Sequence, residues 1–301
     1  MKLLALLIGL AVERLATQLF HLRTLRWLDR AIDFGFRQGD RFANWPSFIP
    51  VTVLVIVLVL PVVLARLGLG DTLYGFPYLI LAILVLFFSL GPKDIGEDVD
   101  EYCRAIEEDD PVRIQETARA LIESDVPEDA AERIRMVEES VCIQANNRLF
   151  AVVFWFVLLG PVGAWTYRVT DLIRRRAVFN ALRADLGDET PLTAASEMLH
   201  GWLVWIPARL TAIGYAMAGS FDGALSAWRK ADDTVPSTSH GQSERLLARV
   251  GTGALGLRDE EGESLADRGI RGATSANGLV YRLLFIWAAV IGAMTLYGWS
   301  V

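Results

Sequence analysis

Long apolar runs without a charged residue constrain this chain more than any other feature of its sequence. Residues 48–65 and 73–90 contain no charge, and each approaches the roughly 20 residues that cross the apolar core of a bilayer. Residues 149–167 form a third uncharged run, and residues 283–301 form a fourth with aromatic residues typical of membrane interfaces. These runs predict an all-α, polytopic, integral membrane protein.

Two further runs contain charges and still fit membrane spans. Residues 3–20 include Glu13 and Arg14, and residues 198–219 include Arg209. Because acidic Glu13 interrupts the first run and no small-residue cleavage site follows it, we expect this run to be retained rather than removed as a signal peptide. The second run spans the membrane or forms a re-entrant segment.

The basic residues favour six spans. If all six runs cross, the segments 21–47, 91–148 and 220–279 share one side and carry 19 Lys and Arg residues, against 7 on the other side. The positive-inside tendency then places these three segments in the cytoplasm. This topology puts Tyr167 and Arg168 on the opposite side.

The chain divides into an N-terminal membrane part, a polar module and a C-terminal membrane part. Residues 1–90 hold spans at about 3–20, 48–65 and 73–90, together with a basic amphipathic helix over 21–37 that suits the lipid interface. Residues 149–301 hold spans at about 149–167, 198–219 and 283–301. Between the last two, the Gly, Ser and Thr residues of 220–279 predict a flexible loop that contains a short helix near Gln242 to Arg249.

Residues 91–148 form an acidic cytoplasmic module. They contain 17 of the 36 acidic residues but only 7 of the 29 basic residues. Apolar residues recur at helical spacing, and Asp110-Pro111 provides an N-cap followed by a proline in the first helical turn. The sequence therefore predicts a small helical module.

Several function classes lack the residues they require. A net charge of −7 argues against a general nucleic-acid binder, and two cysteines cannot build a disulfide scaffold. The chain has no phosphate-binding loop, no dinucleotide-binding glycine motif and no Gly-x-Ser-x-Gly elbow. The three histidines are scattered, and Cys103 and Cys142 have no partner at metal-ligand spacing. We therefore predict no catalytic residue, no metal and no cofactor.

Charged residues inside the predicted spans are the main indication of a functional site, because each costs roughly 2.5–3.5 kcal/mol at the centre of a span. We expect them to line a polar, cytoplasm-facing pocket for an anionic small molecule. The predicted ligand-binding residues are Glu13, Arg14 and Arg209, with Lys93, Asp94, Asn146 and Asn147 at the rim. The alternatives are a structural ion pair such as Glu13 with Arg209, a lipid anchor at Lys93, and a helix cap at the two asparagines.

The chain resembles the AmpE family of bacterial inner-membrane proteins over nearly its whole length. The resemblance lies in residues 3–15, Asn146 to Phe150, Phe154 to Phe156, Gly160 to Ala164, Tyr167-Arg168 and Ile206 to Leu210. It implies a regulator of β-lactamase induction, linked to peptidoglycan recycling and encoded beside the AmpD amidase. The expected function is regulatory rather than enzymatic.

AmpE in turn is similar to the CobD/CbiB membrane enzymes of cobalamin synthesis. The shared positions include Phe154-Trp155, Tyr167-Arg168 and Pro207-Ala208-Arg209. The two acids of that family's Glu-Asn-x-x-Asp stretch are absent, because the aligned positions hold Ile143 and Asn147. The other shared positions remain despite this loss, and they imply an alternative function, a synthase that joins an amine to a carboxylate.

The predicted partners follow from these features. We expect contact with the lipid bilayer, and binding of an AmpD-type amidase or another cytosolic protein at the acidic module. The small residues Gly160 and Gly163 allow a homodimer, although they serve packing within one chain equally well. No nucleic-acid partner is expected.

Overall fold

The computed structural model of this chain describes residues 26–39, 46–69, 76–90, 94–122, 125–183, 190–232, 239–257 and 260–296. Every regular element within these ranges is a helix. Three helices are long and apolar enough to cross a membrane. The predicted all-α membrane fold is confirmed.

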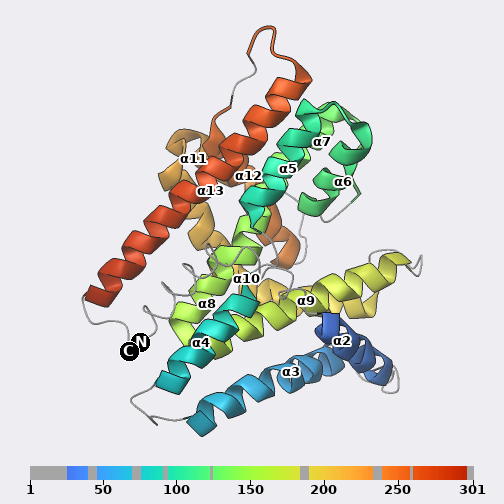
Figure 1. Ribbon diagram of the computed structural model, residues 1–301, viewed down its shortest axis with the longest axis vertical. Coiled ribbons are helices and arrows are strands. Elements are labelled where there is room, and N and C mark those ends of the chain that lie inside the picture. Colours follow the sequence, from blue (N-terminus) through green and yellow to red (C-terminus); the bar gives the residue numbers. More distant parts are fainter. Residues whose placement is uncertain are drawn as a thin grey trace.

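The helices follow one another along the chain with short connections (Figure 1). Their bounds are α2 Arg26–Gly39, α3 Phe48–Leu69, α4 Phe76–Ser89, α5 Ile95–Glu107, α6 Pro111–Leu121, α7 Ala130–Ala145, the π-helical segment η4 Asn146–Phe150, α8 Ala151–Leu159, α9 Pro161–Arg183, α10 Pro191–Ala218, α11 Phe221–Asp232, α12 Ser239–Leu255 and α13 Leu265–Leu296. In Figure 1, α3 and α4 lie at one end of the molecule, and α5, α6 and α7 lie at the other.

The three helices that are long and apolar enough to cross a membrane differ in how far the protein covers them. They are Phe48–Leu69, the continuous helix Ala130–Leu159 and Leu265–Thr295. The most apolar window of Ala130–Leu159 is 67% buried, whereas the windows of the other two are 17% and 22% buried. Ala130–Leu159 is thus a central helix, and α3 and α13 present apolar side chains outward, where lipid can cover them.

The predicted spans match helices to different extents. Residues 48–65 lie within α3, residues 73–90 contain the shorter apolar helix α4, and residues 198–219 lie in α10, which begins earlier at Pro191. Residues 283–296 form the second half of α13, which begins at Leu265. The run 3–20 lies outside the described residues.

The apolar run 149–167 is not one helix, and the prediction of a single span there is wrong. Gly160 has φ 70°, a left-handed conformation that favours glycine, and Pro161 begins the next helix. A Cβ on Gly163 would lie 2.4 Å from the Trp155 carbonyl oxygen, so only glycine permits this close approach. Helices α8 and α9 therefore pack as a hairpin, and α9 returns toward the end of α7.

The acidic module is helical and is continuous with the membrane part. Asp94, Asp110 and Asp129 each accept a backbone N–H bond at the start of α5, α6 and α7, and Pro111 occupies the first turn of α6 as predicted. Helices α5 and α7 also pack against α13. There Arg268 of α13 pairs with Glu138 of α7.

The prediction of a flexible loop over 220–279 is wrong for the described residues, apart from the short helix expected near Gln242 to Arg249, which lies within α12. These residues form α11, α12 and the first half of α13. The small residues provide close packing rather than freedom: a Cβ on Gly251 of α12 would lie 2.4 Å from the Cys142 sulfur of α7. The Ser220 N–H also donates to the Ala254 carbonyl across 2.7 Å, which ties α11 to α12.

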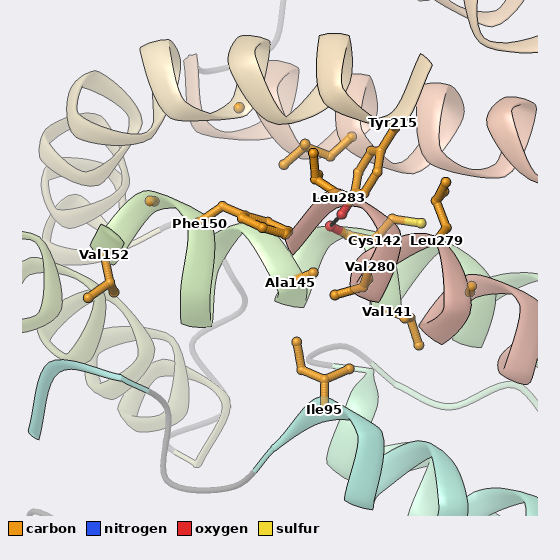
Figure 2. Close-up of a cluster of buried hydrophobic side chains, with 14 of the residues drawn as sticks. Ile95, Val141, Cys142, Ala145, Phe150, Val152, Tyr215, Leu279, Val280 and Leu283 are labelled. Atoms are coloured by element: carbon orange, nitrogen blue, oxygen red, sulfur yellow. Dashed lines mark hydrogen bonds between the residues drawn. The ribbon is translucent and has the colours of Figure 1, made fainter. Parts of the chain in front are cut away.

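The main apolar core lies where α7, α10 and α13 meet (Figure 2). Tyr215 of α10 is fully buried, and its hydroxyl donates to the Cys142 carbonyl across 2.8 Å. Leu279 and Leu283 of α13 lie beside this pair, and Ile95 points into the cluster from α5. This core holds the acidic module and the membrane helices together.

The basic helix predicted for 21–37 is α2 within the described residues. Its apolar side packs inside the protein rather than only on lipid, because Leu28 and Ile32 are almost completely buried. Asp33 on the same helix forms an ion pair with Arg176 of α9. The helix is therefore fixed to both α3 and α9.

Candidate functional site

Charged side chains gather inside the protein where the central helix meets α9 and α10. We call this set the arginine cluster. It consists of Asp98, Gln144, Asn147, Arg148, Arg168, Asp171, Arg174, Arg175 and His200, all of which are buried except Arg175, whose side chain is 28% exposed. Buried charges are rare unless they are paired, so this group is a candidate functional site.

Asp171 lies at the centre of the cluster and is completely buried. Its carboxylate accepts hydrogen bonds from Arg168 at 3.1 Å, from Arg174 at 3.4 Å and from Arg175 at 3.0 Å. All four residues belong to α9, because positions three and four residues away from Asp171 lie on the same side of a helix. One carboxylate thus organises three guanidinium groups.

The charges of these arginines determine the protonation state of Asp171. Burial by itself would raise the pKa of Asp171, but Arg175, Arg174 and Arg168 outweigh that effect and lower it below its usual value. Burial also lowers the pKa of Arg168 to about 10, which still leaves it charged at neutral pH. Asp171 and Arg168 are therefore both ionised at pH 7.

The π-helical segment η4 brings two asparagines to the cluster. A π-helical turn holds an extra residue, and such turns are frequent at functional sites. Asn147 accepts from Asn146 at 3.1 Å and from the Tyr167 hydroxyl at 3.5 Å, while Asn146 accepts from Thr211 of α10 at 3.0 Å. Both asparagines, which were predicted as site residues, thus lie buried between α9 and α10.

Arg148, also in η4, connects the cluster to the acidic module. It donates to Asp98 of α5 at 2.7 Å, to the Ala120 carbonyl of α6 at 3.0 Å and to Gln144 at 3.0 Å. The same Gln144 oxygen accepts from Arg175 at 3.3 Å. A continuous series of polar contacts therefore leads from α9 to the start of α5.

Two of the scattered histidines meet at the edge of this cluster. The rings of His200 and His240 lie 4.8 Å apart, and the His200 ring lies 5.3 Å from that of Tyr167. His200 is fully buried, with its Nε2 at 3.8 Å from the Asp171 carboxylate. In the part of the chain that the structure describes, no group of three or more potential His, Cys, Asp or Glu ligands could hold a metal.

Several buried donors of the cluster have no hydrogen-bond partner within the described ranges. They are Arg168 Nε, Asn147 Nδ2 and the one ring nitrogen of neutral His200 that carries its proton, since neither nitrogen of that ring makes a hydrogen bond. A buried donor that makes no hydrogen bond costs about 1–3 kcal/mol, so these groups need an acceptor. Together with the guanidinium groups, they suit an anion rich in oxygen acceptors.

The other predicted site residues are placed differently. Asp94 caps α5 by accepting from the Gly96 N–H at 3.2 Å. Arg209 is half-buried on the outer face of α10, where its guanidinium lies 3.8 Å from the centre of the exposed Trp205 ring. Because Arg209 and Thr211 lie two residues apart on one helix, their side chains point in nearly opposite directions, so Arg209 does not join the asparagines.

Three predicted residues, Glu13, Arg14 and Lys93, lie outside the described residues. The placement of Tyr167 and Arg168 away from the asparagines is wrong, because the turn at Gly160 brings α9 back beside η4. Sequence reasoning missed Asp171 and its arginines as a site. The available signal was an acidic residue flanked by Arg at positions −3, +3 and +4.

Comparisons with known proteins find one matching family and two curated relatives with a different name. The profile of a family described as "Regulatory signalling modulator protein AmpE" matches residues 1–298. Two curated proteins are each named "Cobalamin biosynthesis protein CobD". That of Stutzerimonas stutzeri is 24% identical over 216 residues, covering 69% of this chain and 68% of that protein. That of Chromobacterium violaceum is 28% identical over 189 residues, covering 60% of this chain and 55% of that protein. No solved structure matches this chain.

Proposed function

Because this chain belongs to the AmpE family, we propose that it is a multi-pass protein of the bacterial inner membrane that modulates β-lactamase induction in response to peptidoglycan recycling. In this proposal the arginine cluster binds an anionic metabolite. The acidic module then transmits the bound state to a cytosolic protein, such as an AmpD-type amidase. In this proposal the protein acts by binding rather than by catalysis.

One observation carries this proposal: the contacts from Arg175 through Gln144 and Arg148 to Asp98. An anion that attracts the Arg175 guanidinium competes with Gln144 for it. Any shift of Gln144 changes the position of Arg148, which holds the first turn of α5 through Asp98. A binding site and a signalling surface are thereby connected through discrete polar contacts, which a regulator requires.

The acidic module offers a suitable surface for a basic partner. Asp100, Glu107 and Glu108 are exposed on α5 and at its end. Asp98, in contrast, is buried against Arg148 and serves the structure. We expect Asp100→Lys with Glu107→Lys to weaken capture of a cytosolic partner without lowering the thermal midpoint, and unchanged capture would show that this surface is only solvated.

The test of the regulatory proposal uses a bacterium with an inducible β-lactamase whose own family member has been deleted. Complementation with this chain should restore the normal induction curve, whereas Arg175→Gln should not. Arg176→Gln is the matched control, because the adjacent Arg176 pairs with Asp33 outside the cluster. Protein amounts in the membrane are compared by immunoblot. Equal induction with all three proteins would refute the proposal.

The second candidate function is a synthase that joins an amine to a carboxylate substrate. Its support is the similarity to two proteins named for cobalamin biosynthesis. Against it, the arginines around buried Asp171 lower the pKa of this carboxyl group, so it does not hold the proton that a general acid donates. Amide formation by the purified protein, abolished by Arg168→Gln, would establish the synthase.

A further inference from the structure

We infer that the arginine cluster binds the phosphoryl group of a phosphate monoester. The inference rests on the proposed function, because it names the chemical class of ligand for the same site. It starts from buried nitrogens that the protein leaves without hydrogen-bond partners, all of which are donors except one of the two in the neutral His200 ring. Arg168 Nε, Asn147 Nδ2 and the nitrogens of His200 are buried and make no hydrogen bond to any described residue.

These donors lie close together although they belong to three helices. The Tyr167 hydroxyl lies 3.5 Å from Asn147 Oδ1, and the Tyr167 ring lies 5.3 Å from that of His200. Arg168 follows Tyr167 in the chain and donates to Asp171, which is 3.8 Å from His200. Short contacts thus connect the residues of η4, α9 and α10 that carry these nitrogens.

The number and direction of the donors favour a tetrahedral oxyanion. A carboxylate ligand presents two oxygens in one plane, whereas a phosphate monoester presents three strongly accepting oxygens that point in different directions. The nitrogens without partners belong to three different elements, η4, α9 and α10, so a group with three accepting oxygens can satisfy more of them than a group with two. The surrounding guanidinium groups favour negative charge, and Arg is the side chain best suited to phosphate.

Arg175 marks the side from which a ligand enters. Its side chain is 28% exposed, whereas those of Arg168 and Arg174 are 4% and 7% exposed. It already contacts Asp171 and Gln144, so it can exchange these acceptors for a phosphoryl oxygen. The neighbouring Arg176 points to Asp33 of α2 and has no part in the cluster.

The experiment measures anion binding to the full-length protein in nanodiscs of phosphatidylcholine, by calorimetry and thermal unfolding at constant ionic strength. The probes are glycerol phosphate, with three terminal oxygens, dimethyl phosphate, with two, and acetate. We expect glycerol phosphate to bind at least tenfold more tightly than either of the other two. Equal affinities, or no binding by any probe, would overturn the inference.

Two conservative variants test the named donors. Asn147→Asp keeps the oxygen that accepts from Asn146 and Tyr167 but replaces the Nδ2 donor with a negative oxygen. Arg168→Lys keeps the positive charge and removes Nε. Each should weaken glycerol phosphate binding at least tenfold, whereas the control Asn180→Asp, on α9 beside Asp33, should not. If a variant fails to fold, as judged by its unfolding profile without ligand, the other decides; equal affinity in the folded variants and wild type would overturn the inference.

A further arm identifies the source of the phosphoryl group. This arm uses nanodiscs that contain phosphatidic acid. If the site takes a lipid, phosphatidic acid occupies it and prevents glycerol phosphate from binding. If the site takes a soluble ligand, phosphatidic acid leaves the affinity for glycerol phosphate unchanged. Both results support phosphoryl recognition. The two proposals can fail separately. If β-lactamase induction depends on Arg175 but no phosphate monoester binds, the regulatory function is supported and the inferred ligand class is wrong.

Discussion

Asp171→Asn tests the central charge of the arginine cluster. The carboxylate is completely buried and accepts hydrogen bonds from Arg168, Arg174 and Arg175. Asparagine has nearly the same shape but no charge, so the three guanidinium groups lose their shared counter-ion. Removing one partner of a buried ion pair costs about 3–5 kcal/mol, and we expect that loss here.

This magnitude is large enough to measure. For a chain of 301 residues, the average entropy of unfolding converts 1 kcal/mol into a shift of roughly 1.5 °C in the thermal midpoint. Asp171→Asn should therefore lower the midpoint by about 5–8 °C relative to wild type in phosphatidylcholine nanodiscs without added anions, followed by tryptophan fluorescence. A midpoint within about 1 °C of wild type would refute the assignment of Asp171 as the counter-ion.

Asp33→Asn is the matched control. Asp33 also pairs with an arginine, Arg176, but both side chains are about a quarter exposed, and such pairs contribute only about 0–1 kcal/mol. The hydrogen bond from Arg176 lowers the pKa of Asp33 below its usual 3.8, so this small stabilisation is present above that value and lost as the pH falls through the lowered pKa. The midpoints of Asp33→Asn and wild type should therefore converge below about pH 4.

Three further substitutions test the fold around the cluster. Arg148→Ala removes the guanidinium that pairs with buried Asp98 and should cost about 3–5 kcal/mol, seen as a lower thermal midpoint; an unchanged midpoint would contradict this ion pair. Gly163→Ala places a Cβ 2.4 Å from the Trp155 carbonyl oxygen, so the yield of folded, monodisperse protein should fall sharply, whereas a normal yield would disprove the close approach. Val57→Asp puts a charge on the exposed face of α3 at a cost of roughly 2.5–3.5 kcal/mol and should reduce resistance to alkaline extraction from membranes; full resistance would exclude lipid contact there.

The sequence by itself determined the class of the fold and several helices. An uncharged apolar run can satisfy its backbone polar groups in lipid only as a helix, which is why residues 48–65 predicted α3. Asp110-Pro111 predicted the start of α6, because the cap and the proline act within one turn of the chain. Both signals are local, so they can be read without knowing which other parts of the chain pack against these helices.

Tertiary structure decided how the helices reverse and pack. Gly160-Pro161 and the small residues after it fit equally well in a continuous span or a turn, and only the approach of Gly163 to Trp155 selects the hairpin. The small residues of 220–279 likewise fit a loop as well as a tightly packed helix. Contact between Gly251 and Cys142 settles the latter, and it joins residues more than 100 positions apart.

The candidate site shows the same division. The spacing of three arginines around Asp171 is readable from the sequence, because it lies within two helical turns. Their burial is not readable, since it depends on α9 folding back beside η4 and on His200 arriving from α10. Arg209 illustrates the converse: its charge within an apolar run predicted a pocket, yet the rotation of α10 turns it outward onto Trp205. Charge is a property of the sequence, whereas the solvent or protein that surrounds a charge is decided only by packing.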